Sequence, residues 1–272
     1  MAFITPNLNV MINAVRKASK GLLRDFGEIE KLQVSLKGTN DFVSTADLKC
    51  EKALKAELSK ARPSYGFLME ESKEEIGSEP DMRWIVDPLD GTTNFLHGIP
   101  HFAISVALAK GNEIIDAVIF NPVLDELYFA EKGNGAYLAN ARNDERLRVS
   151  SRRDIKSSLI ATGIPFLGHG DHEFFLKQLT KVMGNTAGVR RFGAASLDLA
   201  WVAAGRYDGF WEMGLKSWDV AAGLLIVKEA GGMVTESTAA DIRGDHTQKI
   251  LETGNILASN GALHAALNKI LN

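Results

Sequence analysis

The residues best suited to chemistry in this chain are two aspartates, Asp87 and Asp90, that follow an apolar run at 84–86. The run is typical of a buried strand, and Pro88 and Gly91 are expected to break it. Carboxylates and backbone carbonyls are the ligands of hard cations such as Mg²⁺, Ca²⁺ and Mn²⁺. The first N–H groups of a helix after the break would face an anion; they belong to Gly91, Thr92 and Thr93. This stretch therefore predicts a site for metal ions and a phosphate.

An ordinary turn is the alternative interpretation, because Asp-Gly-Thr alone is usually a turn with a helix N-cap. The string at 87–95 is longer than a turn needs. Other acids also fall where turns would not require them: Glu70 and Glu71 follow a short apolar run, and Asp219 follows Trp218.

These three places resemble the motifs of one protein family. Residues 87–95 are similar to D-P-x-D-G-T-x-N-F, the signature of the inositol monophosphatase family of metal-dependent, lithium-sensitive phosphatases. Residues 69–72 resemble its G-E-E-S element, with Met69 in place of glycine, and residues 218–223 resemble its W-D-x-A-A-G element. The resemblance runs from about Lys37 to the C-terminal region and is nearest to bacterial members.

The resemblance implies a catalytic site with two Mg²⁺ ions and a weaker third ion near Glu70. Glu70, Asp87 and the carbonyl of Leu89 would hold the first ion. Asp87, Asp90 and Asp219 would hold the second, so that Asp87 bridges the two. Two ions about 4 Å apart can bind the attacking and leaving oxygens of a phosphate ester together. The implied reaction is hydrolysis of a phosphate monoester by direct attack of water, without a phosphoenzyme.

The resemblance also implies roles for individual residues in catalysis and substrate binding. Glu70 and the Thr92 hydroxyl would orient and deprotonate the water, and with Asp90 they form the predicted catalytic set. The N–H groups of Gly91 and Thr92 would cradle the phosphate. The full set of implied substrate-binding residues is Asp90, Gly91, Thr92, Gly193, Ala194, Ala195, Glu212 and Asp219.

Four further residues have roles that the sequence leaves open. Residues 37–42 are either a connector or a mobile loop, and in the second case Lys37 would contact phosphate or metal-bound water. Asp47 is a natural helix N-cap, and the resemblance implies that it also orders the water around a metal. Arg190 and Arg191 would contact substrate, a partner or another subunit.

The reaction follows from the resemblance more firmly than the substrate does. The implied binding residues suit a small phosphorylated polyol such as myo-inositol 1-phosphate. The same scaffold serves fructose 1,6-bisphosphate, 3′-phosphoadenosine 5′-phosphate and histidinol phosphate. A binding role is a further alternative, since some bacterial relatives act as partners of the transcription machinery.

A haloacid-dehalogenase-type phosphatase is the other enzyme considered. Such enzymes carry D-x-D-G-T, in which the nucleophilic aspartate stands two residues before the second aspartate. Here Asp87 and Asp90 are three residues apart, Pro88 lies between them, and the motif does not follow the first strand of the chain. These differences argue against that mechanism.

The composition is that of an ordinary globular protein. The 272 residues are 45% hydrophobic and 24% charged, with a net charge of −3, which does not indicate direct nucleic-acid or membrane binding. No apolar run is long enough to span a membrane, and no signal peptide is recognised. A single cysteine, Cys50, fits a cytoplasmic location and excludes an internal disulfide. His169 and His172, three residues apart, have no matching acid or cysteine in a metal-site pattern, so we expect a surface loop and a first helical turn rather than a metal site.

The periodicities predict an α+β fold of one domain, residues 1–272, with halves at about 1–145 and 146–272. The first half is predicted to hold helices at about 7–31 and 47–61 and antiparallel strands; the second alternates strands and helices. Asn7, Asp47 and Asp219 are the expected N-caps of their helices. The family resemblance implies a layered αβαβα sandwich, a site at the junction of the halves, and a homodimer.

Overall fold

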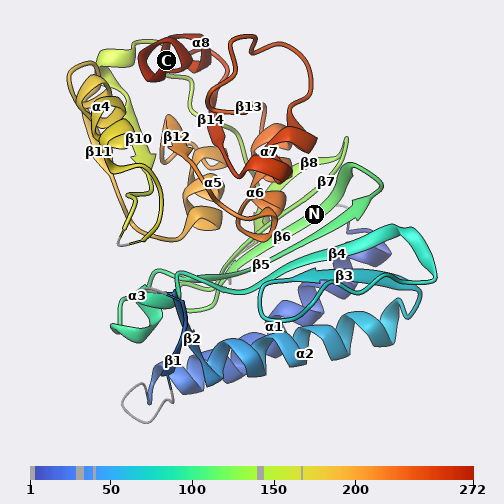
Figure 1. Ribbon diagram of the computed structural model, residues 1–272. Helices are drawn as coiled ribbons and strands as arrows, with labels where there is room; N and C mark the ends of the chain where they lie inside the picture. The colour runs from blue at the N-terminus through green and yellow to red at the C-terminus, as the bar shows by residue number, and fades with distance from the viewer. Residues whose placement is uncertain (1–3, 29–33, 39–40, 140–143, 167) are drawn as a thin grey trace.

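The computed structural model describes residues 4–28, 34–38, 41–139, 144–166 and 168–272, with 34–38 and 41–44 described as backbone only. Five layers are stacked from the N-terminal helices at the bottom of Figure 1 to the C-terminal helix at the top. The helices are α1 (Pro6–Phe26), α2 (Thr45–Ala61), α3 (Thr92–Leu96), α4 (His172–Met183), α5 (Ala195–Ala203), α6 (Ser217–Glu229), α7 (Thr247–Thr253) and α8 (His264–Leu271).

Two sheets and one hairpin account for the strands of the described chain. The hairpin pairs β1 (Val34–Gly38) with β2 (Asp41–Ser44). The larger sheet has, in spatial order, β3 (Tyr65–Met69), β4 (Glu79–Asp90), β5 (Ala103–Lys110), β6 (Glu113–Asn121), β7 (Glu126–Glu131), β8 (Gly135–Ala139) and β9 (Asp144–Arg146). The smaller sheet has, in spatial order, β11 (Gly188–Arg190), β10 (Leu159–Thr162), β12 (Gly209–Glu212), β14 (Ile256–Asn260) and β13 (Gly232–Thr235).

The layers follow from which faces are apolar. Helix α1 buries Leu8, Met11, Val15 and Leu22 at helical spacing, so it can cover the larger sheet with one stripe. Helices α5 and α6 are apolar almost all round, because they lie between the two sheets. Helices α4 and α8 cover the outer face of the smaller sheet. This αβαβα arrangement confirms the predicted fold class.

Several predicted boundaries were wrong. Helix α1 ends at Phe26 rather than near residue 31, because Gly27 caps it, and its N-cap is Thr5 rather than Asn7. Residues 37–42 were expected to be a loop, but they lie in or between β1 and β2; residues 39–40 are outside the described chain. Helix α7 was not predicted.

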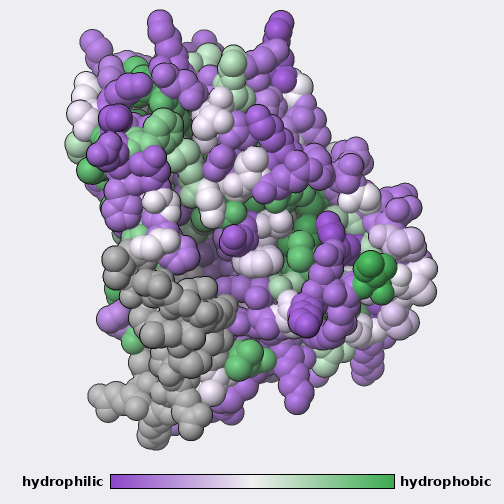
Figure 2. Space-filling model, in the orientation of Figure 1, coloured by the Kyte–Doolittle hydropathy of each residue, from purple (hydrophilic) through white to green (hydrophobic). Residues whose placement is uncertain are grey.

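One face of the molecule is seen in Figure 2. The side of the molecule in Figure 2 is mostly hydrophilic, with small separate groups of hydrophobic residues. Within the described residues, no helix is both long enough and apolar enough to cross a membrane.

Candidate active site

The two motif aspartates lie on either side of an irregularity in β4, and Asp90 is the last residue of this strand. Strand β4 stays paired with β5 through Asp87, and the register shifts before pairing resumes at Asp90. Pro88 has no N–H to donate, and such a bulge is where a sheet tolerates proline. The N–H of Leu89 donates instead to Asp87 Oδ1 at 2.8 Å. The prediction that the strand breaks at Pro88 was therefore wrong, whereas the predicted break at Gly91 is confirmed, because β4 ends at Asp90. Across the bulge the two carboxylates are close enough for Asp90 to raise the pKa of Asp87.

Thr92 follows the strand at the first position of α3. Gly91 precedes it with a φ of 92°, a conformation that favours glycine. Thr92 Oγ1 lies 3.0 Å from the carbonyl oxygen of Leu89 and 3.1 Å from Asp47 Oδ1. Asp47 is fully buried at the third position of α2, so the prediction that it is the N-cap was wrong. Its carboxylate is fixed against the Thr92 hydroxyl.

Glu70, Asp87, Asp90 and Asp219 form a cluster of carboxylates. Glu70 follows β3, and its N–H donates to the carbonyl of Val86 in β4. Burial, followed by repulsion from Glu70, Asp90 and Asp219, raises the pKa of Asp87 well above its usual value. Burial also raises the pKa of Asp90 to about 6, against hydrogen bonds from Ser196 that lower it. The pKa of Asp219 is raised by burial and then by Asp90.

The cluster has the chemistry of a divalent-cation site. Buried carboxylates that repel one another are stabilised either by protons or by a bound cation, and oxygen donors are those that Mg²⁺ takes. The donor set therefore fits such an ion. In the described chain, however, no three acidic, histidine or cysteine side chains are already grouped as a metal site.

Asp219 approaches the cluster from α6. The helix begins at Ser217. Lys216, the residue before the helix, donates its N–H to Asp219 Oδ2 at 2.7 Å. Asp219 therefore reaches back from the third helical position, as the acid of a capping box does. The prediction that it is the N-cap was wrong by three residues.

Asp90 and Asn94 join the two halves of the chain. Asp90 Oδ2 accepts hydrogen bonds from the N–H (2.7 Å) and the hydroxyl of Ser196, in the first turn of α5. Asn94 Nδ2 donates to the carbonyls of His101 at 2.8 Å and Phe192 at 2.7 Å. Sequence analysis missed Ser196 altogether. It gave Asn94 no role, although the residue stands in the signature motif.

The turn before α5 brings Arg191 towards the site. Gly193 has a φ of 81°, and a Cβ built on it would lie 2.5 Å from Arg191 Nη1. Ala194 precedes the helix and Ala195 begins it. Burial, and then repulsion from Asp90, raises the pKa of Glu212 to about 8, which Arg191 opposes. Of the two arginines left open by the sequence, Arg191 is thus the one near the acids.

Glu212 is fitted closely against Gly163, a residue that sequence analysis missed. Glu212 ends β12, and Gly163 follows the neighbouring strand β10. A Cβ on Gly163 would overlap the Glu212 carboxyl group. Only glycine leaves room for this side chain in its present position.

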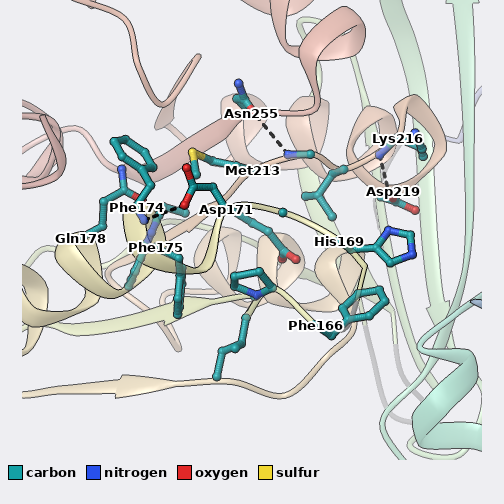
Figure 3. A pocket seen from close by; sticks show the side chains of 18 of the residues that line it. Phe166, His169, Asp171, Phe174, Phe175, Gln178, Met213, Lys216, Asp219 and Asn255 are labelled. Atoms are coloured by element: carbon teal, nitrogen blue, oxygen red, sulfur yellow. Dashed lines mark hydrogen bonds between the residues drawn. The ribbon is translucent and has the colours of Figure 1, made fainter. Parts of the chain in front are cut away.

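These acids open into a cavity of about 630 Å³. Glu70, Glu212 and Asp219 line it together with residues 163–166 and 169–171, helix α4, residues 213–216 and the start of α6. Figure 3 shows Asp219 and Lys216 on one side of it and Phe174, Phe175 and Gln178 on the other. His169, expected in a surface loop, is exposed but lines this cavity too. A volume of this order suits a small-molecule ligand.

Lys37 and Cys50 are the remaining residues that the sequence singled out. The Lys37 side chain is outside the described part of the chain. Cys50 is buried in α2, and burial, with Asp47 and Asp87, raises the pKa of its thiol.

The sequence model described as "Inositol monophosphatase family" matches residues 5–272. The chain belongs to the inositol monophosphatase family. An inositol-1-monophosphatase of Rhizobium meliloti is 56% identical over 97% of this chain and 95% of its own length. A protein of Pseudomonas aeruginosa named Nus factor SuhB is 42% identical over 96% of this chain and 94% of its own. The solved structure of extragenic suppressor protein suhB from Bartonella henselae has a TM-score of 0.92 and 51% identity, covering 98% and 99% of the two chains.

Membership of the inositol monophosphatase family confirms the resemblance drawn from the three motifs. It makes the chain a phosphatase of a family that generally uses divalent metal ions, acting on a phosphorylated substrate. The residues that bind metal and substrate in this chain stay predictions.

Proposed function

We propose that this chain is an inositol-1-monophosphatase that hydrolyses myo-inositol 1-phosphate to myo-inositol and phosphate. The observation that carries the proposal is the cluster of Glu70, Asp87, Asp90 and Asp219, of which Glu70 and Asp219 line a cavity with Glu212 on its wall. The name of the Rhizobium relative supports the same substrate.

The ions of this proposal are Mg²⁺. Glu70, Asp87 and the Leu89 carbonyl would hold the first, and Asp87, Asp90 and Asp219 the second; a third would lie near Glu70. When bound, the metal would neutralise phosphate charge and lower the pKa of water. Asp87 is prepared for the bridging role because the N–H of Leu89 fixes its Oδ1 at 2.8 Å.

Glu70 and Thr92 would prepare the attacking water. The Thr92 hydroxyl has one proton, and with the Leu89 carbonyl engaged by the first ion, Asp47 Oδ1 at 3.1 Å would accept it. The lone pairs of Thr92 Oγ1 are then turned towards a donor, and a water that donates to Thr92 is oriented for attack. Glu70 would take the second proton as general base.

The substrate would be held at both ends. The N–H groups of Gly91 and Thr92, at the turn into α3, would donate to the phosphate oxygens. The hydroxyls of the polyol would meet Glu212, Asp90, Asp219 and the turn of Gly193, Ala194 and Ala195. In this arrangement Asp90 would bind metal and substrate while it holds the first turn of α5 through Ser196.

The substrate assignment is tested by comparing phosphate release from four esters in the presence of Mg²⁺. The esters are myo-inositol 1-phosphate, fructose 1,6-bisphosphate, 3′-phosphoadenosine 5′-phosphate and histidinol phosphate. We expect the highest kcat/KM for myo-inositol 1-phosphate and inhibition by lithium. A higher value for another ester would replace the substrate while leaving the reaction class unchanged.

A second candidate is a binding role with the transcription machinery. It is favoured by the name Nus factor SuhB of the Pseudomonas relative. The test is a cell in which the chain is replaced by the Asp90→Asn variant. If growth depends on the chain and the inactive variant supports it fully, the binding role is correct; if growth requires hydrolysis, the enzymatic role is the important one.

We also propose a homodimer in the cytoplasm, with Lys37 as an accessory contact to phosphate or metal-bound water. Sedimentation at micromolar concentration tests the dimer: a single species of monomer mass would contradict it. A Lys37→Ala variant with unchanged kcat and KM would remove the proposed lysine contact.

A further inference from the structure

Glu51 is a buried acid beside the candidate site that the proposed mechanism does not use. It lies in α2, four residues after Asp47, and only 7% of it is exposed. Residues four apart are neighbours on one face of a helix, so the two acids leave α2 on the same side. Burial raises the pKa of the Cys50 thiol, and Asp47, Asp87 and Glu51 raise it further, as acids packed around it would. A polar group buried at this place requires a partner.

The partner of Glu51 is the backbone next to Glu70. Glu51 Oε2 accepts a hydrogen bond of 2.8 Å from the N–H of Glu71. On the other side of Glu70, its own N–H donates to the carbonyl of Val86 in β4 at 3.3 Å. A hydrogen bond from a backbone N–H to a carboxylate is shorter and stronger than one between neutral groups. The two bonds therefore anchor the peptide units on both sides of the Glu70 Cα.

The bond from Glu71 to Glu51 lies just past the end of a strand. Strand β3 ends at Met69, and the chain then turns back so that Glu75 pairs with Phe67. Glu70 lies in the turn between these pairings. A residue has only two soft backbone dihedrals, so anchoring both of its peptide units fixes the direction of its side chain. The Glu70 carboxylate therefore approaches the acidic cluster from a defined direction.

The same side of α2 also holds the other group that we propose prepares the attacking water. Asp47 Oδ1 lies 3.1 Å from Thr92 Oγ1. Helix α2 thus provides one acid for the Thr92 hydroxyl and a second acid, Glu51, for the backbone beside Glu70. Because the spacing of residues along a helix is fixed, α2 is a common support for Thr92 and Glu70.

We propose that Glu51 is a positioning residue, which acts through the N–H of Glu71 to hold Glu70 where it binds the first ion and activates water. The inference rests on the proposed function, which gives those two tasks to Glu70. Loss of a group that orients a metal ligand typically lowers metal affinity or activity by roughly 10- to 100-fold. The role requires an acceptor oxygen, so an amide can replace the Glu51 carboxylate, whereas an apolar side chain of the same length cannot.

The test replaces Glu51 by glutamine, which keeps an acceptor oxygen, and by methionine, which has a similar shape and lacks one. Binding of Mn²⁺ to metal-free protein, followed by the EPR signal of free Mn²⁺, reports on the site without turnover. We expect Glu51→Met to weaken the tightest Mn²⁺ site by roughly 10-fold or more. It should lower kcat for myo-inositol 1-phosphate by roughly as much at saturating Mg²⁺, with little change in KM. Glu51→Gln should stay close to the wild-type chain in each measurement.

The matched control is Glu57→Met, the same replacement in the same helix, where the carboxylate pairs with Lys17 at the surface. It should leave Mn²⁺ affinity and kcat unchanged. Action through Glu70 is tested in a Glu70→Gln background, in which Glu51→Met should weaken Mn²⁺ binding no further. Hydrogen exchange of the metal-free protein is an independent readout: the amide of Glu71 should exchange faster in Glu51→Met and not in Glu51→Gln.

Three outcomes would overturn the inference. The first is wild-type Mn²⁺ affinity and kcat in a folded Glu51→Met chain. The second is equal damage from glutamine and methionine, which would mean that the site uses the charge of Glu51 and not its hydrogen bond. The third is a loss of Mn²⁺ affinity that persists in full in the Glu70→Gln background.

Two further variants keep the test decisive. Glu51→Asp is shorter by one methylene and should not reach the N–H of Glu71, so it replaces Glu51→Met if that variant does not fold. Glu70→Gln alone tests the proposed function: full hydrolysis of myo-inositol 1-phosphate by this variant would contradict the tasks given to Glu70. If Glu70→Gln is inactive while Glu51→Met is harmless, the proposed function stands and only the inference fails.

Discussion

Replacing Gly163 by alanine should disable Glu212 without unfolding the chain. The new Cβ would overlap the Glu212 carboxyl group, and nothing else is nearer to it. The obstacle is the end of a flexible side chain rather than backbone, so Glu212 can turn away at little cost to stability. What is lost is the position of the carboxylate that we propose accepts a hydroxyl of the substrate.

The expected size of the effect follows from that one contact. Because burial raises the pKa of Glu212 to about 8, the assay is run at pH 9, where this carboxylate is mostly ionised. A hydrogen bond to a charged group contributes about 1.5–3 kcal/mol. At about 1.4 kcal/mol for each factor of ten, its loss lowers kcat/KM for myo-inositol 1-phosphate by roughly 10- to 150-fold. Hydrolysis of methyl phosphate, which has no hydroxyl to meet Glu212, should change much less.

The assay is kcat/KM for both esters in Gly163→Ala, Glu212→Gln and the double variant. Because both single changes disturb the same carboxylate, the double variant should be hardly worse than the poorer single variant. Gly21→Ala is a matched control, since nothing lies within 4 Å of a Cβ at Gly21 in the middle of α1. It should keep full activity and gain about 0.5–1 kcal/mol of stability. Full activity of Gly163→Ala on myo-inositol 1-phosphate would refute the reasoning.

Three further predictions concern the groups around the cluster. Thr92→Val, which cannot donate to Asp47, should lower kcat by about 10²–10⁴-fold while KM changes little. Thr92→Ser keeps the hydroxyl and should retain most of the wild-type rate. Equal rates in the two variants would contradict the role of the hydroxyl. Asn94→Ala leaves two backbone carbonyls without their donor, and urea denaturation should show a free energy of unfolding lower by about 2–5 kcal/mol. A loss below about 1 kcal/mol would mean that this amide does not join the two halves of the chain. Burial raises the pKa of Glu212 to about 8, so the folded chain binds a proton at this group more readily than the unfolded chain does. The metal-free protein should therefore gain stability as the pH falls from 9 to 7. Histidine ordinarily titrates below this range of pH. Glu212→Gln should reduce this gain, and a metal-free wild-type chain that loses stability between pH 9 and 7 would contradict it.

The sequence predicted the parts of the site that a short motif contains. Asp87, Asp90 and Thr92 lie within six residues, so one local string defines them. Glu70 and Asp219 could be added only through resemblance, since no rule of spacing connects them to that string. The structure brings these acids close enough to shift one another's pKa, and their function as ligands awaits experiment.

Other features depend on contacts between distant parts of the chain. The bonds from Ser196 to Asp90 and from Asn94 to the carbonyl of Phe192 span about 100 residues, and no local pattern indicates them. The errors at Asp47 and Asp219 have a related cause. Both were assigned as N-caps from residue type, whereas Asp47 is engaged by Thr92 and Asp219 reaches back from inside its helix.

The strand boundary at Pro88 failed for a different physical reason. Proline removes one hydrogen bond from a sheet, but a bulge at the same place leaves no donor missing from the ladder. The same bulge sets the spacing of Asp87 and Asp90. The deviation from the local rule therefore lies at the candidate site.

The most direct test of the account is phosphate release from myo-inositol 1-phosphate as Mg²⁺ is titrated, with the wild-type chain and with Asp90→Asn. The account predicts no release without a divalent ion, saturable activation by Mg²⁺, and loss of nearly all activity in the variant, whose thermal unfolding should show that it still folds. Turnover that is independent of Mg²⁺, or full activity in a folded Asp90→Asn chain, would contradict the claim that the carboxylate cluster is the catalytic centre.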